Sequence, residues 1–530
     1  MNHTRGQSEY KSFMKNFSIS ILLLFIAFFS CTTSGMKEEK PMGEWEYLNK
    51  LSEESLELNG IQLAAVYCGA CHLKPGPELL DKKTWETTVL PEMRRRLGLV
   101  IAEDFGHDVG EDTNAPPGIY STKKLISREN WDKIQTYYLD AAPEKLPTIE
   151  SKLDSEGPIP GFSLIFPQYK NKRPNLTTLT RWDGISNQLI IGDRFRRLYT
   201  VEGKTLEIMD SLSISSPASD IRFRENGTFD LLTMGVMDPS NFAIGKWLAY
   251  SAFDMQVEEI KMDSLRRPVH FSFSDLNQNG KEDVVVCNFG HHIGNLSWYE
   301  NTDAGFIQHV LNTEPGARKT IIADFNLDGL PDIAVLMTQA KEGIYAYINQ
   351  GNGNFKQEVW LNFHPVFGGS DFEMADMNAD GYLDIVLVNG DNADYSPILK
   401  PYHGLRIFLN DGQNRFEEKM FYPMHGASGL LVADFDQNGG LDIAVLSYFP
   451  DPSKSPKQNF LYFKNHGLMD FSVHALENQR NNSWLTIEKG DVDQDGSLDI
   501  ILGSFDFKSQ RAYPMENWMP FAILKNQGMN

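Results

Sequence analysis

The chain has 530 residues, which is enough for two or three domains. Its formal net charge of −22 and its pI near 5.0 argue against binding to nucleic acid, so we expect no nucleic-acid partner. The sequence contains no phosphate-binding loop, no Gly-x-Ser-x-Gly elbow and no His-Glu-x-x-His motif, so these three common catalytic signatures are excluded.

Residues 1–30 have the pattern of an export signal. An apolar core at 19–29 follows three basic residues and is too short to span a bilayer as a helix. The run ends at Cys31, and the segment resembles the signal of a bacterial lipoprotein, with Phe28 where leucine is usual. The resemblance implies lipidation at Cys31, a linker over 31–58, membrane attachment through the lipid only, and a cell-envelope location as an outer-membrane lipoprotein facing the periplasm or the surface. A plain secretory signal is the alternative.

A second motif, Cys68-Gly-Ala-Cys71-His72, has the Cys-x-x-Cys-His spacing of a haem c attachment site. Two thiols one helical turn apart can reach both vinyl groups of a porphyrin, and the adjacent histidine can bind the iron. A zinc site would need a second ligand pair, but residues 40–150 otherwise offer only His107 and no further cysteine. A redox dithiol would be expected in a βαβ setting, which this region lacks. The motif predicts haem c, with Cys68 and Cys71 as its covalent ligands and His72 as an axial ligand.

The residues around this motif, 59–146, resemble a small all-α cytochrome c domain of class I. We expect a first helix at 60–67 that runs into the haem motif. A last helix is expected at 127–139, where Ser127 is suited to cap its start and Pro143 follows its end. The resemblance implies that these two helices pack together beside the haem.

The sixth ligand of the iron is less directly indicated. Met93 follows a proline and offers a soft thioether, which suits a high-potential electron-transfer haem. His107 is the alternative, and a second imidazole would lower the potential. Three arginines follow Met93, and they could neutralise haem propionates or form a solvated face. We predict Met93 as the ligand.

A segment rich in Pro, Glu and Ser, 147–160, is expected to be a linker, and 161–530 to be one repeat domain. Five nine-residue runs in this domain place oxygen-bearing side chains at positions one, three, five and nine and glycine at position six, which is the layout of a calcium loop. The predicted calcium ligands are Asp275, Asn277, Asn279 and Asp283; Asp324, Asn326, Asp328 and Asp332; Asp376, Asn378, Asp380 and Asp384; Asp434, Asp436, Asn438 and Asp442; and Asp491, Asp493, Asp495 and Asp499.

The five runs recur at spacings of about 49 to 58 residues, and a β-branched stretch follows each of them. Two incomplete copies, at 183–187 and 226–230, lack the oxygen set and are not expected to hold calcium well. Seven units of about 53 residues with four short strands each predict a seven-bladed β-propeller. The repeats resemble the FG-GAP and VCBS repeat family, whose members are calcium-bound propellers. The simplest role of each ion is to staple a hairpin.

Residues just before the Asp-rich runs should line the central channel. They could bind a sugar or another polar ligand, or they could simply be solvated. The polar residues there are His270, Arg318, Lys319, Ser370, Asp371 and Ser428. Cys287 lies in an apolar run and is expected to be a buried apolar residue.

Together these patterns predict a multidomain fold, a small all-α cytochrome c domain followed by an all-β seven-bladed propeller. We expect an exported haem c electron-transfer lipoprotein whose calcium-stabilised propeller is a binding or docking module. One alternative is an oxidoreductase whose propeller binds substrate and passes electrons to the haem. The other is a glycan-binding or adhesive surface protein. The partner would be a redox protein, a polysaccharide or a small molecule, and the sequence indicates no catalytic residue.

Overall fold

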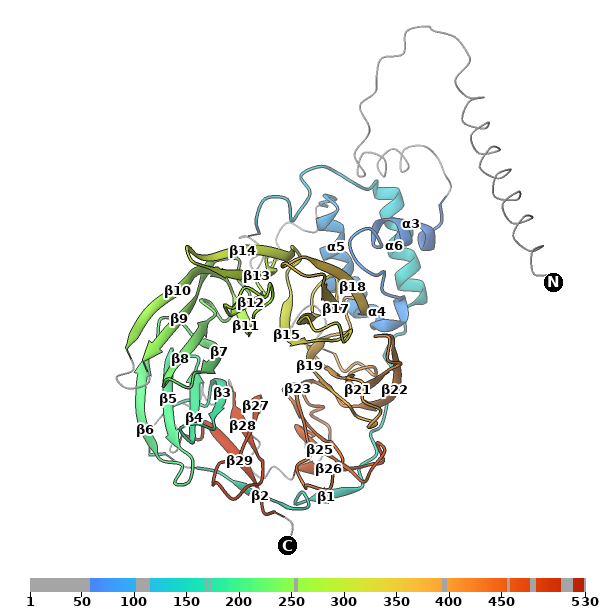
Figure 1. Ribbon diagram of the computed structural model, residues 1–530. Helices are drawn as coiled ribbons and strands as arrows, with labels where there is room; N and C mark the ends of the chain where they lie inside the picture. Colours follow the sequence, from blue (N-terminus) through green and yellow to red (C-terminus); the bar gives the residue numbers. More distant parts are fainter. Residues whose placement is uncertain are drawn as a thin grey trace, which may run out of the picture. The chain divides into compact units, whose positions relative to one another are not determined.

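The computed structural model describes residues 58–101, 115–167, 169–170, 173–251, 256–392, 398–454, 458–476, 483–506 and 518–528, and Glu57–Asn530 forms one compact unit (Figure 1). The predicted signal peptide with Cys31, the linker as far as residue 57, and His107 lie outside the described residues. Within those ranges, no helix has the length and apolar character needed to cross a membrane.

The described part of the chain begins with helices. Asn59 caps the first of them, because its side chain accepts the backbone N–H of Gln62 while the Gln62 side chain accepts the backbone N–H of Asn59. Ser127 caps the last, by accepting the backbone N–H of Asn130 at 3.1 Å. The helices are α3 (Gly60–Tyr67), η1 (Pro77–Leu79), α4 (Lys82–Thr84), η2 (Trp85–Val89), α5 (Leu90–Arg96) and α6 (Arg128–Ala141).

Helices α3 and α6 pack against each other, as the resemblance implied. A Cβ atom added to Gly60 would lie 2.3 Å from the carbonyl oxygen of Lys133 and 2.7 Å from Cβ of Tyr137, so only glycine allows this approach. The core beneath is built around the indoles of Trp85 and Trp131, which are almost completely buried. This helical packing agrees with the expected helix pair, and the assignment to cytochrome c stays a prediction.

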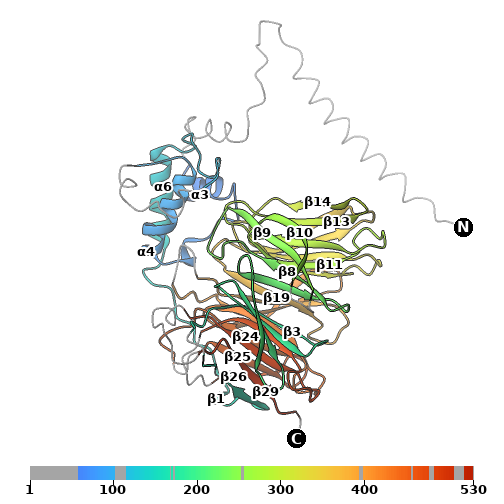
Figure 2. The ribbon, with the colours of Figure 1, turned by 90° about the vertical axis from the view of Figure 1, so that its left-hand side faces the viewer.

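The described strands after the helices form seven sheets arranged as a ring of blades (Figure 1), which Figure 2 shows from the side. The all-β seven-bladed propeller is therefore confirmed. The first strand of each blade contacts the first strands of its neighbours, so these strands are innermost. Blade 1 contains β3 (Thr177–Asp183), β4 (Gln188–Asp193), β5 (Arg197–Glu202) and β6 (Ile208–Ser213); blade 2 contains β7 (Ala218–Phe223), β8 (Thr228–Thr233), β9 (Ala243–Ser251) and β10 (Val257–Arg266).

The next three blades have the same four-stranded antiparallel order. Blade 3 contains β11 (Pro268–Ser274), β12 (Asp283–Asn288), β13 (Asn295–Thr302) and β14 (Gly305–Asn312); blade 4 contains β15 (Ala317–Ala323), β16 (Asp332–Met337), β17 (Gly343–Asn349) and β18 (Phe355–Asn362); blade 5 contains β19 (Gly369–Ala375), β20 (Asp384–Asn389), β21 (Gly404–Asn410) and β22 (Phe416–Pro423).

The last two blades close the ring with strands from both ends of the domain. β2 (Phe162–Ile165) pairs antiparallel with β29, and β1 (Ser155–Gly157) pairs parallel with β26. The segment expected as a linker therefore contains a strand of blade 6. Blade 6 contains β23 (Ala427–Ala433), β24 (Asp442–Ser447), β25 (Phe460–Asn465) and β26 (Phe471–Leu476); blade 7 contains β27 (Trp484–Gly490), β28 (Asp499–Ser504) and β29 (Phe521–Asn526).

The second strand of each of blades 3 to 7 is completely buried along its length. These are the β-branched stretches that follow the Asp-rich runs, and their burial confirms the expected core strands. Cys287 lies in one of them, β12, and is fully buried, as expected. Their side chains pack against those of the adjoining blades, as Val386 and Val388 of blade 5 do against Leu430 of blade 6.

Candidate functional site

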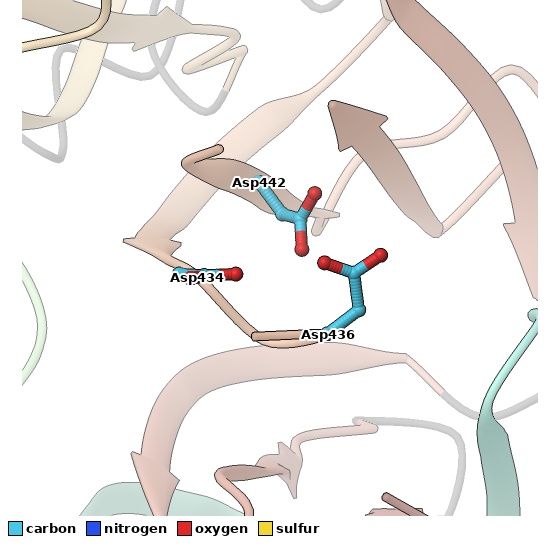
Figure 3. Close-up of side chains that lie close together, drawn as sticks. All are labelled: Asp434, Asp436 and Asp442. Carbon is cyan, nitrogen blue, oxygen red and sulfur yellow. The ribbon is translucent and has the colours of Figure 1, made fainter. Parts of the chain in front are cut away.

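The Asp-rich runs are the loops that join the first and second strands of blades 3 to 7. In blade 6, the carboxylates of Asp434, Asp436 and Asp442 point toward one another, with oxygens that all lie within 4.8 Å (Figure 3). Asp434 accepts the backbone N–H groups of Asn438 at 2.9 Å and Gly439 at 2.8 Å, which fixes the turn. Gly439 has a φ angle of +90°, the left-handed conformation that glycine favours.

The aspartate at position nine has a second, purely structural role. In blade 6, Asp442 is buried, and its Oδ1 accepts the backbone N–H of Asn465 at 2.7 Å while its Oδ2 accepts that of Phe435 at 3.3 Å. This carboxylate thus joins the loop to the end of the third strand. The same pair of backbone bonds is made by Asp283, Asp332, Asp384 and Asp499.

Burial raises the pKa of all five position-nine aspartates, and it raises that of Asp499 to about 6, with Asp493 and Asp495 contributing. In blade 7, the oxygens of Asp491, Asp493 and Asp499 again converge. Oδ1 of Asp493 is buried and has no hydrogen-bond donor. A buried carboxylate oxygen without a donor costs free energy, and a hard cation would satisfy it. The residues of these loops therefore fit calcium.

Blades 3 to 5 carry asparagine rather than aspartate at position three. In blade 4, Asn326 Oδ1 accepts the backbone N–H of Asp328 at 3.0 Å, and Asp324 accepts the same N–H and that of Gly329. The position-five side chain turns back onto the loop, since Asp328 Oδ1 accepts the N–H of Leu330 at 2.9 Å. The loop fold is thus shared by blades with two, three or four carboxylates.

The two incomplete copies lie at the equivalent turns of blades 1 and 2. In blade 2, the completely buried Asp230 accepts hydrogen bonds from the indole of Trp247 at 2.9 Å and from the guanidinium of Arg224 at 2.5 Å. An arginine thus supplies the positive charge there. In blade 1, Asp183 only accepts hydrogen bonds from its own turn.

The haem motif lies at the end of α3. Cys68 is the residue that ends this helix, and its backbone N–H donates to the carbonyl of Ala64 at 3.0 Å. Cys68 is half-buried and Cys71 is exposed, and neither forms a disulfide. Burial raises the pKa of the Cys68 thiol to about 11. His72 donates from Nδ1 to the carbonyl of Leu73 at 3.0 Å, which leaves Nε2 as the lone-pair nitrogen.

Met93 lies on α5 and is half-buried against the helical core. Glu92, a residue that the sequence analysis missed, forms ion pairs with two of the arginines that follow Met93. This buried carboxylate pairs with Arg95 and with Arg96, and it accepts a hydrogen bond from Tyr120 at 2.6 Å. Arg95 and Arg96 therefore share the charge of a single carboxylate. The spacing of Glu92 from Arg95 and Arg96, three and four residues on one helix, is the signal that could have revealed the pairs.

Loops of the propeller contact the helical segment. The Tyr402 hydroxyl, between β20 and β21, lies 3.0 Å from the carbonyl oxygen of Leu79. Val366 and Ile398 pack against the helical core, and the ring of His292 meets that of Tyr120 edge-on at 6.3 Å. Because propeller residues contact the helical core, tests on this region require the full chain.

The channel-lining side chains mostly connect neighbouring blades. Asp220 accepts the backbone N–H of Phe271 at 3.3 Å, and Asp371 accepts that of Leu430 at 3.2 Å and the ammonium of Lys319 at 2.9 Å. His270 accepts from Thr320 in the same way, and burial lowers its pKa to about 4. A cavity of about 310 Å³ at this ring is lined by Arg181, Asp220, Ile221, Arg222, His270, Phe271 and Phe273.

Three of the six predicted channel residues, His270, Lys319 and Asp371, therefore belong to the set of channel-lining side chains that connect neighbouring blades. Ser370 instead bonds to the carbonyl of Gly368, and Ser428 accepts the backbone N–H of Tyr448. Arg181, which pairs with Asp220 at 2.8 Å and with Glu488 at 3.1 Å, was missed because the repeats of blades 1 and 2 are too degraded to align.

A family model agrees with this repeat architecture. The model of the FG-GAP-like repeat matches residues 275–335 and 324–387. The chain carries FG-GAP-like repeats. Each matched range begins at the first aspartate of a loop and ends in the buried second strand of the following blade. The FG-GAP loops of blades 3 to 5 are thus recognised independently of the spacing argument.

The T-cell immunomodulatory protein homolog of Plasmodium yoelii yoelii is 29% identical over 140 residues, which are 24% of this chain and 19% of that protein. The match spans about one fifth of the length of this curated relative. Among solved structures, the Pan2 WD40 domain of Neurospora crassa has a TM-score of 0.43 at 11% identity and covers 67% of this chain and 90% of its own. The Cps50 (Swd1) β-propeller domain of Myceliophteria thermophila has a TM-score of 0.42 at 10% identity, with coverages of 67% and 99%.

Proposed function

We propose that this protein is an exported haem c electron-transfer lipoprotein whose calcium-stabilised propeller is a docking module for a redox partner. The observation that carries the proposal is the arrangement of Cys68, Cys71 and His72 at the end of α3. Two reduced thiols lie beside a histidine whose Nδ1 is already bound to a backbone carbonyl, as in most metal-ligating histidines. Burial lowers the pKa of His72, which favours the neutral imidazole that binds metal.

The surroundings of the motif support a haem in the same place. Cys68 and Cys71 would hold the porphyrin, His72 would bind the iron, and Met93 would be the second axial ligand. Leu73, next to the histidine, is 48% exposed, so its side chain is accessible to a bound porphyrin. When bound, the haem would supply one-electron transfer.

Calcium in the FG-GAP loops of blades 3 to 7 is the second part of the proposal. The converging carboxylates of blades 6 and 7 and the donor-free oxygen of Asp493 support it. The ions would hold the loops that connect the innermost strands to the buried second strands, and so would keep this side of the propeller rigid for docking.

The haem content tests the proposal directly. We expect one covalently attached haem per chain when the protein is produced with export and a haem c maturation system, because both thiols are available. The measurement is the absorption spectrum of the reduced protein in alkaline pyridine, together with the mass of the intact chain. A chain that keeps its apoprotein mass under these conditions would refute the electron-transfer function.

The lipid anchor gives a separate prediction. Cys31→Ser should move the protein from the membrane fraction to the soluble fraction, because the thiol that would carry the lipid is lost. Cys287→Ser is the matched control, since Cys287 is buried in β12 and should leave the fractionation unchanged. The measurement is immunoblotting of separated membranes together with mass spectrometry of the mature N-terminus. Cleavage elsewhere, without a diacylglycerol on Cys31, would contradict lipidation.

A further inference from the structure

In two blades, a lysine of the third strand contacts an acidic side chain of the FG-GAP loop. In blade 6, Nζ of Lys464 lies 2.8 Å from Oδ2 of Asp436, the residue at position three. In blade 7, Lys525 forms the equivalent ion pair with Asp493. Both lysines come from the third strand of their blade, and all four side chains are between one fifth and about one third exposed. These contacts are therefore partly shielded from water.

The lysines occur only in the loops that have an aspartate at position three. The equivalent third-strand residue is the one before the asparagine that bonds to the position-nine aspartate. In blades 3, 4 and 5 it is Glu300, Ile348 and Leu409, and position three is asparagine each time. In the same chain, a lysine thus accompanies each carboxylate at position three, which makes the pairing a charge compensation.

In blade 2, which has no calcium loop, a basic side chain also pairs with an aspartate of the turn. There the guanidinium of Arg224 binds the buried Asp230, in a turn that has lost the other oxygen ligands. A basic side chain can therefore maintain this type of turn. Blades 6 and 7 combine both features, since they keep the full oxygen set and also hold an ammonium group.

Blades 6 and 7 are also the blades at which the ring closes, because they take up β1 and β2. We propose that Lys464 and Lys525 act as internal cations that hold the loops of the two closing blades together when calcium is absent, and that calcium competes with them for Asp436 and Asp493. The loops of blades 6 and 7, at which the ring closes, should then lose less stability on calcium removal than the loops of blades 3 to 5. This inference rests on the proposed calcium binding.

The test compares thermal unfolding of the full chain with and without calcium. In Lys464→Met/Lys525→Met, calcium neutralises the loops, so the melting temperature in saturating calcium should equal that of the wild type. In chelator, the uncompensated carboxylates repel one another, and the double variant should melt about 3 °C or more below the wild type. Lys356→Met, which breaks a surface pair with Glu358, is the matched control and should shift neither value.

Three further variants complete the test. Adding Asp436→Asn and Asp493→Asn to the double variant removes the repulsion and should restore the melting temperature in chelator. The single lysine variants should each show part of the loss. In calcium titrations followed by calorimetry, the double variant should bind calcium more tightly than the wild type, because the competitor has been removed.

The outcomes separate this inference from the calcium proposal. If the wild type binds no calcium, the calcium role fails. If the wild type binds calcium, but the double variant and the wild type have the same melting temperature in chelator, the lysines are not internal cations. An equal loss of stability with and without calcium would make them ordinary structural residues and would also overturn the inference.

Discussion

Removing calcium should lower the melting temperature of the propeller by about 10 °C or more. Each ion that binds only the folded state adds roughly 2.7 kcal/mol at a concentration 100 times its Kd, and five loops offer sites. Without the ions, the acidic side chains of each loop remain close together and repel one another, and Lys464 and Lys525 offset only part of this repulsion in blades 6 and 7. The measurement is calorimetry of the full chain in calcium and in chelator, with the calcium content determined by elemental analysis.

A single-site variant makes this result specific to the FG-GAP loops. Asp324→Asn removes one carboxylate from the loop of blade 4 with little change in shape, and it should lower the calcium content from about five ions per chain to about four. Asp183→Asn is the matched control, because the turn of blade 1 lacks the other oxygen ligands. Identical melting in calcium and chelator, with no calcium in the protein, would rule out the calcium role.

Replacing Cys68 and Cys71 by alanine should abolish covalent haem attachment completely, because each thioether bond to the porphyrin needs one of these thiols. In the wild type, Met93 as sixth ligand should give the weak sulfur-to-iron absorption band that the resemblance to class I cytochromes implies. Met93→Ala should remove that band and open the iron to small ligands such as carbon monoxide. These spectra are measured on the oxidised and reduced full chain.

His107→Ala is the comparison that decides between the two candidate ligands. It should leave the band and the reduction potential unchanged if Met93 binds the iron. Loss of haem coordination in His107→Ala, with a normal spectrum in Met93→Ala, would assign the ligand to His107. The potential would then be lower, because imidazole stabilises ferric iron more than a thioether does.

The sequence was a good guide wherever the structure depends on local patterns. The buried second strands follow directly from the β-branched residues after each Asp-rich loop, and the starts of α3 and α6 follow from the caps Asn59 and Ser127. The five loops were predictable because they repeat one spacing. In blades 6 and 7, the carboxylates at positions one, three and nine do converge, as that spacing indicated.

Features that depend on distant residues could not be predicted in this way. Strand β1 has only three residues and exists because the edge of β26 is available to it, so its own sequence carried no strand signal. The contact between Tyr402 and Leu79 joins parts of the chain 323 residues apart. The pairing of Lys464 with Asp436 depends on two strands of one sheet coming together, and no nearest-neighbour pattern in the sequence marks it.

The pairing of β2 with β29 has a consequence for how the protein is made. Gln527 bonds to Ser163 across 364 residues of sequence, so β2 is synthesised long before its partner β29. At a ribosomal rate of roughly 5–20 residues per second, β2 must wait for tens of seconds. During that time its edge is a template for wrong pairing, and joining it to the last strand is a non-local, slow step. Helices α3 and α6, in contrast, are close in sequence and can pair early, but the helical core gains its contacts with Val366 and Ile398 only once that part of the propeller has been synthesised.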